Sequence, residues 1–227
     1  MDTWLYLMNK TTDTNSPAPP QRRISLWLLA PVGIALGFLL VFLLMQLLGG
    51  TLFAPRSLHG TVLQSPEPMA NFMLTAHTGQ PVSLHDYQDK VVMLYFGYTF
   101  CPDACPATMS HLAQAMEKLT STQQEQIQVF MVTVDPERDT KEQLADYMAY
   151  FHPSFVGLTG TADEIAQVAT PLGIYYRQEA GTAASGYLVN HTTSVLVIDK
   201  KGYLRLTYPF NTPVEEIAAD MRVLVRE

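Results

Sequence analysis

Apolar positions along the chain form one long run, followed by shorter runs that alternate with amphipathic stretches. The long run, residues 24–48 (ISLWLLAPVGIALGFLLVFLLMQLL), contains no charged residue. A helix of about 20 apolar residues crosses a bilayer core, whereas a secretory signal has a hydrophobic stretch of only about 7–15 residues. The segment after the run, GGTLFAPRS, offers no convincing A-x-A cleavage site. The pattern therefore predicts an uncleaved single-pass transmembrane anchor over 24–48.

The remainder of the chain divides into a linker over 49–70, rich in Pro, Ser and Gly, and a domain over 71–227. Short apolar, β-favouring runs in this domain indicate strands that are covered on both faces. We expect such strands at 91–98 and 128–135, and a shorter one at 155–159. The segments 194–199 and 203–208 flank a Lys-Lys-Gly turn, which is typical of an antiparallel hairpin.

Stretches with apolar residues at helical spacing separate these strands. The first helix is expected to carry Met109, Leu112, Met116 and Leu119 on one face. The later helices have capping signals at their starts, namely Thr140 with Gln143, Thr161 with Glu164, and Thr212 followed by Pro213 and Glu215. The resulting order, β-α-β-α-β-α-β-β-α, predicts a thioredoxin-like α/β domain preceded by a single transmembrane helix.

Charge gives the expected topology. The chain has 14 basic and 21 acidic residues, a net charge of −7, which argues against a nucleic-acid partner. Lys10, Arg22 and Arg23 precede the anchor, and only Arg56 follows it closely. Because basic residues stay on the cytoplasmic side, residues 1–23 are expected to be a short cytoplasmic tail and the domain to be periplasmic.

The tail and the anchor carry two weaker signals. Residues 1–23 lack the Arg-rich, amphipathic pattern of a mitochondrial presequence, which favours a bacterial inner membrane. Gly33 and Gly37 form a GxxxG motif that predicts a weak homodimer contact. The simpler interpretation, small residues in a membrane helix, is favoured because the motif is short and common.

The chain has only two cysteines, Cys101 and Cys105. Two thiols exclude a multi-disulfide scaffold and any zinc or iron–sulfur site that needs four thiolates. Both lie in YTFCPDACPATM, between an apolar strand and a helix. Because Pro106 fits only the first turn of a helix, Cys105 is expected to be the cap and Pro106 the first helical residue. The positive end of the helix dipole favours thiolates there.

Six histidines are candidates for a third ligand: His59, His77, His85, His111, His152 and His191. His191 is favoured because it comes immediately before the hairpin strand 194–199, at a position that faces the redox loop in a thioredoxin-like domain. Two thiolates and one neutral imidazole make a three-coordinate set, which suits Cu(I) better than a closed four-coordinate structural zinc site.

Three segments resemble the Sco/SenC family of membrane-anchored, thioredoxin-fold copper proteins. They are GYTFCPDACP (97–106), VTVDPERDT (132–140) and VNHTTSVLVID (189–199). The resemblance implies that Cys101, Cys105 and His191 bind copper, as Cu(I) and Cu(II). It also implies a role in cytochrome c oxidase assembly, either delivering copper to the CuA centre of subunit II or keeping its thiols reduced.

The same resemblance implies outer roles for three further residues. Asp103, between the cysteines, and Asp135, in the D-P-x-R-D-T string, match positions behind the ligands or facing a partner. Asn190 stands where the family more often has Asp before the histidine. An outer carboxylate orients a ligating imidazole, so the change at residue 190 is expected to affect copper affinity while leaving the ligand in place.

Three alternatives to a metallochaperone remain open. A thiol–disulfide oxidoreductase is the first, although such enzymes have two residues between the cysteines and a proline opposite them, whereas this chain has three residues and His191-Thr192. A peroxidase is a weaker alternative. A purely structural disulfide between Cys101 and Cys105 would close a very small loop and stabilise the domain little.

Overall fold

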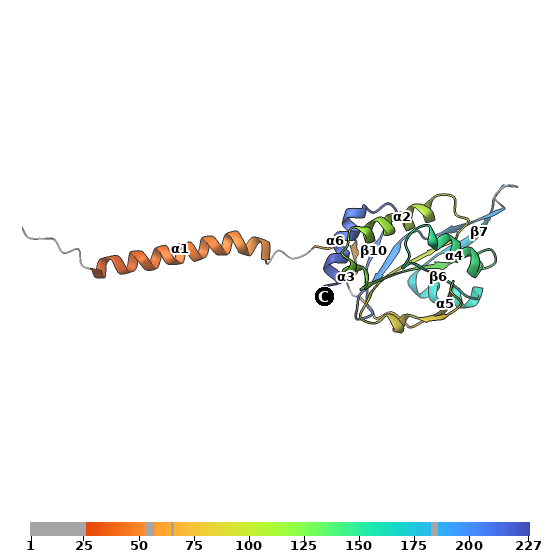
Figure 1. Ribbon diagram of the computed structural model, residues 1–227, viewed down its shortest axis with the longest axis horizontal. Coiled ribbons are helices and arrows are strands. Elements are labelled where there is room, and N and C mark those ends of the chain that lie inside the picture. The colour runs from red at the N-terminus through yellow and green to blue at the C-terminus, as the bar shows by residue number, and fades with distance from the viewer. Residues whose placement is uncertain (1–25, 53–56, 65, 183–185) are drawn as a thin grey trace, which may run out of the picture. The chain divides into compact units, whose positions relative to one another are not determined.

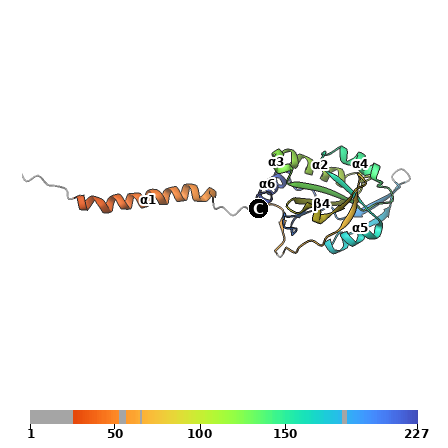
Figure 2. The ribbon, with the colours of Figure 1, turned by 60° about the horizontal axis from the view of Figure 1, so that its bottom comes forward.

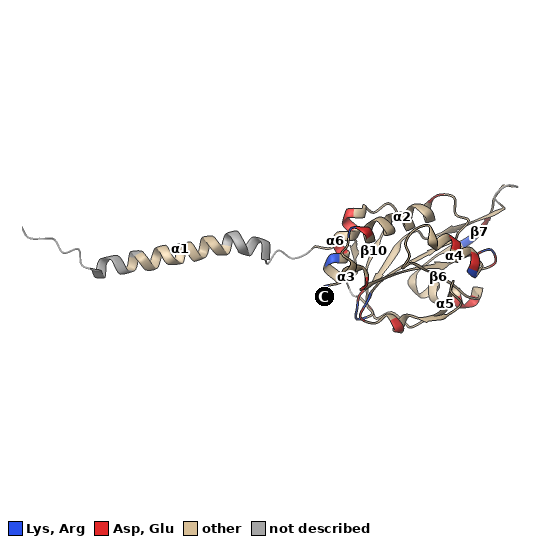
Figure 3. Cartoon of the chain, in the orientation of Figure 1, with Lys and Arg blue, Asp and Glu red and all other residues tan. Residues whose placement is uncertain are grey.

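The computed structural model describes residues 26–52, 57–64, 66–182 and 186–227. The chain forms two compact units, Met1–Pro55 and Arg56–Glu227. The first contains the helix α1 (Leu26–Leu52) with Pro31 inside it, and its described part carries no charged residue (Figures 1 and 3). In the part of the chain that the structure describes, no helix has both the length and the apolar character needed to cross a membrane. The anchor over 24–48 stays a prediction, and the tail 1–23 lies outside the described residues.

The second unit is built on an eight-stranded sheet with the order β1-β10-β9-β4-β5-β6-β2-β3. At its centre, β4 (Val91–Gly97) and β5 (Ile127–Thr133) run parallel, and every residue of both strands is buried. β6 (Val156–Thr159) continues the parallel part, and β9 (Val195–Ile198) pairs antiparallel with β4. The three predicted core strands and the antiparallel hairpin of β9 with β10 (Leu204–Tyr208) are confirmed.

Three strands were not predicted: β1 (Thr61–Val62), β2 (Met73–Ala76) and β3 (Pro81–Ser83). β1 pairs antiparallel with β10, and β2 joins β6 to β3. A short 3-10 helix, η1 (Leu84–Tyr87), follows β3. Because β1 lies in the sheet, the second half of the expected 49–70 linker is part of the domain.

Helices cover both faces of the sheet. α2 (Ala104–Glu117) and α4 (Lys141–Ala149) lie on one side, with α5 (Ala162–Ala169) on the other (Figure 2). The remaining helical segments are α3 (Ser121–Gln124), η2 (Thr170–Leu172) and α6 (Val214–Leu224), which packs against α2.

The expected caps are present at two of the three later helices. The Thr140 hydroxyl accepts a bond from the Gln143 N–H at 3.2 Å, and Thr161 with Glu164 forms a complete capping box. At α6 the prediction is one residue too early, because Pro213 is the cap and the Thr212 hydroxyl donates to the Pro209 carbonyl at 2.8 Å. Thr212 therefore closes the preceding turn instead of capping the helix.

A separate two-stranded antiparallel sheet, β7 (Tyr176–Ala180) with β8 (Tyr187–His191), was also not predicted. Its first strand shows no apolar alternation, since residues 177–180 are all exposed. The register pairs Tyr176 with His191, so that the histidine lies at the end of this hairpin.

Candidate metal centre

The cysteine loop connects β4 to α2 and holds one sulfur on each side of the helix start. α2 begins at Ala104 with Asp103 as its cap, so the expectation that Cys105 is the cap is wrong. The first backbone N–H groups of a helix have no partner within it, and a proline in the first turn therefore removes no bond. Cys105 thus lies inside the first turn, and its N–H donates to the Cys101 sulfur at 3.4 Å.

The two sulfurs have different surroundings. Cys105 is completely buried, whereas Cys101 is partly exposed. The Tyr95 hydroxyl donates to the Cys105 sulfur at 3.5 Å. A Cβ at Gly97 would lie 2.9 Å from the same sulfur, closer than side-chain atoms approach. The end of β4 therefore leaves space for the Cys105 sulfur only because residue 97 has no side chain.

The protonation of the pair is correspondingly unequal. A hydrogen bond from the Cys105 thiol is the main cause that lowers the pKa of Cys101 to about 3. Burial raises the pKa of Cys105 well above its usual range. At neutral pH, Cys101 is therefore a thiolate and Cys105 keeps its proton until a metal or a base takes it.

This asymmetry predicts the pH dependence of alkylation. Iodoacetamide should modify Cys101 in preference to Cys105, at a rate that stays constant between pH 5 and pH 8, because Cys101 is already ionised. The rate for an ordinary thiol, with a pKa of about 8.5, falls about tenfold per pH unit below that value. Peptide mass spectrometry of quenched samples measures both sites. A tenfold rise per unit at Cys101 over this range would contradict the lowered pKa.

His191 reaches the sulfurs from the β7–β8 hairpin. Its Nε2 lies 3.3 Å from the Cys105 sulfur, and its Nδ1 lies 2.9 Å from the Thr192 carbonyl. Because a carbonyl only accepts, Nδ1 carries the proton and the Nε2 lone pair faces the sulfurs. The rings of Tyr95 and Tyr98 pack edge-on to the imidazole. One donor atom each from Cys101, Cys105 and His191 lies within 4.8 Å of the other two.

The other five histidines do not join the two cysteines in the part of the chain that the structure describes. The His59 Nδ1 is 2.8 Å from a carboxylate oxygen of Asp220, which is the main cause that raises the pKa of His59. His77 accepts a bond from the Gly157 N–H, and His152 contacts Ser154. Neither His85 nor His111 joins the cysteines among the described residues.

The three expected outer residues differ in position. Asp103 is exposed and caps α2 without a side-chain cap bond. Asn190 is exposed and its amide donates to Glu179 at 3.4 Å, so the structure does not bring it to the imidazole. The orienting contact for His191 is instead the Thr192 carbonyl. Asp135 is buried and accepts a bond from the Tyr187 hydroxyl at 2.6 Å.

A scan of family models matches residues 61–226 to SCO1/SenC. The chain belongs to the SCO1/SenC family. Among curated relatives, the human mitochondrial SCO1 homolog is 36% identical over 156 residues, 68% of this chain and 52% of that protein. The bovine mitochondrial SCO2 homolog is 33% identical over 160 residues, 70% of this chain and 60% of that protein. The chain thus spans about half to three fifths of the length of these relatives.

Solved Sco structures share the fold. Apo Sco1 from Thermus thermophilus has a TM-score of 0.67 and 40% identity, covering 74% of this chain and 97% of that one. Bradyrhizobium japonicum ScoI with copper bound has a TM-score of 0.64 and 28% identity, covering 70% and 99%. The predicted thioredoxin-like α/β domain is therefore confirmed as the Sco fold.

The donor set of this SCO1/SenC domain fits a soft ion. Two sulfurs and one imidazole nitrogen suit Cu(I), whereas closed structural zinc sites have four ligands. Cys105 and His191 provide the buried part of the set, and Cys101 provides the part nearest to solvent. Sequence reasoning did not single out four residues of the loop, turn and hairpin beside this set: Thr99, Arg138, Asp139 and Tyr187. The D-P-x-R-D-T string is the signal that contained two of them.

Proposed function

We propose that this protein binds copper through Cys101, Cys105 and His191 and delivers it to the CuA centre of cytochrome c oxidase subunit II. The observation that carries the proposal is the approach of the His191 Nε2 to two sulfurs from a distant part of the chain. The copper-bound Sco structures from Bradyrhizobium japonicum, Arabidopsis thaliana and yeast support it.

The exposure of the ligands gives a direction for transfer. Cys101 is partly exposed, and Phe100 beside it is 49% exposed, while Cys105 is inaccessible to solvent. An incoming ligand from an acceptor protein therefore meets copper on the Cys101 side. Cys101 is the ligand that exchanges first, and Cys105 with His191 retains the ion until the acceptor has bound it. Copper is cargo in this scheme, and its oxidation state does not change.

Transfer is the experiment that tests this function. The full-length chain in detergent, loaded anaerobically with Cu(I), is mixed with the apo CuA domain of subunit II, and the copper content of each protein is measured after separation. Copper should move to the acceptor at about one ion per chain. If the acceptor thiols are reduced and the donor still retains all of its copper, the proposed delivery of copper is contradicted.

A second candidate is a thiol–disulfide oxidoreductase that keeps the cysteines of a cuproprotein reduced. Its support is the thiolate at Cys101, partly exposed and next to a second thiol. In this reaction the Cys101 thiolate attacks the partner disulfide, and Cys105 then displaces the partner dithiol while Cys101–Cys105 becomes oxidised. Burial raises the pKa of Cys105, so that thiol must give its proton to a base before the second displacement.

For the remainder of the chain, we propose an anchor over 24–48 in a bacterial inner membrane. Residues 1–23 would be cytoplasmic and the domain periplasmic. The uncharged run and the bases Lys10, Arg22 and Arg23 support this, and Gly33 with Gly37 offers a face for weak self-association. Alkaline extraction of membranes should leave the full-length chain in the pellet. Recovery of the chain in the soluble fraction would contradict the anchor.

A further inference from the structure

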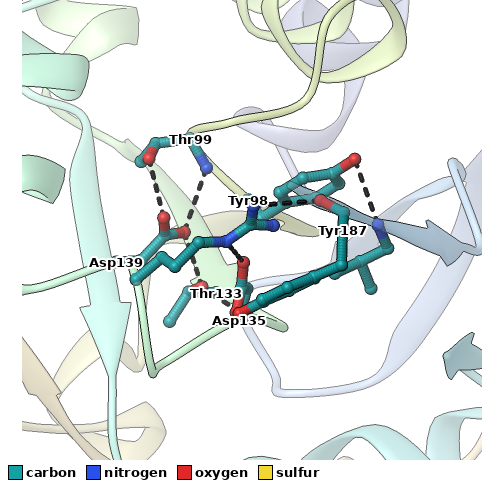
Figure 4. Close-up of polar contacts among 8 residues, drawn as sticks. Tyr98, Thr99, Thr133, Asp135, Asp139 and Tyr187 are labelled. Atoms are coloured by element: carbon teal, nitrogen blue, oxygen red, sulfur yellow. Dashed lines mark hydrogen bonds and ion pairs between the residues drawn. The ribbon is translucent and has the colours of Figure 1, made fainter. Parts of the chain in front are cut away.

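The turn over residues 135–139, between β5 and α4, lies beside the cysteine loop because β4 and β5 are parallel and end at the same edge. The Asp135 carbonyl accepts bonds from the N–H groups of Arg138 and Asp139, at 3.2 and 2.9 Å. The Thr133 hydroxyl accepts from the Asp135 N–H at 2.9 Å and donates to Asp139 at 2.7 Å. These bonds fix the Asp135 backbone and the Asp139 carboxylate relative to the central sheet (Figure 4).

One end of the turn contacts the histidine hairpin. The Arg138 guanidinium carbon lies 3.6 Å from the centre of the Tyr187 ring, and Nη1 donates to the Tyr187 carbonyl at 3.0 Å. Asp135 forms an ion pair with Arg138 and accepts from the Tyr187 hydroxyl at 2.6 Å. Tyr187 begins β8, and His191 ends it. The strand that carries the imidazole is thus attached at its start to the turn (Figure 4).

The other end contacts the cysteine loop. The buried Asp139 carboxylate accepts from the Thr99 N–H at 3.0 Å and from the Thr99 hydroxyl at 2.7 Å. Thr99 lies two residues before Cys101 in the chain. The adjacent Tyr98 links loop and hairpin directly, since its hydroxyl accepts from the Val189 N–H at 3.2 Å.

We propose that the 135–139 turn sets the distance between the sulfurs and the imidazole, with Arg138 positioning the His191 hairpin and Asp139 positioning the cysteine loop. This inference rests on the proposed copper site. Neither residue is a ligand, and each acts through a different one. Arg138 determines whether the Nε2 of His191 reaches the metal, whereas Asp139 determines where Cys101 lies. Removing such outer partners typically weakens metal binding by about 10- to 100-fold.

Arg138→Gln tests the hairpin contact in the full-length chain in detergent. Cu(I) affinity, measured by competition with a chromophoric chelator, should fall by about 10- to 100-fold. X-ray absorption should show a loss of nitrogen from the copper shell with sulfur retained. Because Arg138 acts through His191, the double variant with His191→Ala should bind no more weakly than His191→Ala alone. Arg177→Gln is the matched control, an exposed arginine on β7 whose loss should change nothing.

Thr99→Val tests the contact with the cysteine loop. It removes one hydrogen bond to Asp139 and keeps the size of the side chain. Its effect should persist in the His191→Ala background, because it acts through Cys101. Tyr187→Leu removes the stacked ring from the hairpin side and replaces Arg138→Gln in the tests if that variant does not fold. Equal effects of Arg138→Gln with and without His191 would overturn the positioning role and indicate a general loss of stability.

A metal-free readout separates this inference from the proposed function. In the apo chain, amide hydrogen exchange at Val189 and His191 should be faster in Arg138→Gln than in Arg177→Gln. If the wild-type chain binds no Cu(I), the proposed function fails, and exchange alone decides whether the turn holds the hairpin. If the wild type binds Cu(I) but Arg138→Gln matches it in affinity, copper shell and exchange, the inference alone is overturned.

Discussion

Cys105→Ala should abolish tight Cu(I) binding by the full-length chain, with an affinity loss greater than the about 100-fold that outer partners cause. Cys105 provides the buried sulfur, 3.3 Å from the His191 Nε2, and without it Cys101 is the one cysteine left at the site. Its removal also takes away the main cause of the lowered pKa of Cys101, so the remaining thiol is a weaker ligand at neutral pH. Anaerobic competition titration measures the effect.

Variants of nearby residues that are not ligands serve as controls for the variants of the proposed ligands. Ser110→Ala, on the same helix, should bind Cu(I) as the wild type does. His191→Ala should weaken binding and remove nitrogen from the copper shell, whereas His111→Ala should do neither, because His111 does not join the cysteines. Unchanged stoichiometry and affinity in Cys105→Ala would refute the proposed site, and an unchanged shell in His191→Ala would remove that residue from it.

The second large effect concerns stability. Asp220 on α6 is fully buried, and its carboxylate accepts bonds from the N–H groups of His59 and Gly60 at 2.9 Å. It also accepts from the Tyr208 hydroxyl at 3.1 Å and contacts the His59 ring. Asp220→Ala leaves these donors without an acceptor, so we expect a loss of about 3–5 kcal/mol in the free energy of unfolding. Urea denaturation of the full-length chain in detergent measures it.

Two further variants sharpen that prediction. Asp220→Asn keeps one acceptor oxygen and should lose less stability, while Glu216→Ala, nearer the surface of the same helix, should lose little. The raised pKa of His59 means that its contribution is present below pH about 6.5 and disappears as the pH rises through the raised value. His59→Ala should remove this pH dependence. A loss in Asp220→Ala no larger than in Glu216→Ala would show that the cluster does not stabilise the domain.

The sequence was most informative where burial is complete. The runs 91–98 and 128–135 correspond to β4 and β5, which are buried throughout and mostly apolar because neither face of the central strands meets solvent. The hairpin that bears His191 was missed for the converse reason, since β7 is exposed and polar. Its approach to the cysteines was expected from the thioredoxin-like arrangement, and no local pattern near residue 191 indicates it.

The remaining differences have local causes. Cys105 was placed at the cap because Pro106 was restricted to the first helical position, although the whole first turn tolerates a proline. The expected influence of residue 190 assumed a carboxylate behind the imidazole, whereas a backbone carbonyl at Thr192 occupies that place. Backbone acceptors leave no trace in residue type, so the sequence could not indicate this contact.

Within the described part of the chain, β7 and β8 pair only with each other and share no ladder with the central sheet. Such an element opens with its own free energy, below that of global unfolding. The His191 imidazole is therefore carried by a hairpin that opens before the central sheet unfolds. On warming, metal release should begin at a temperature where the central strands are still intact. The temperature range over which the site holds metal is therefore narrower than the melting curve of the domain suggests.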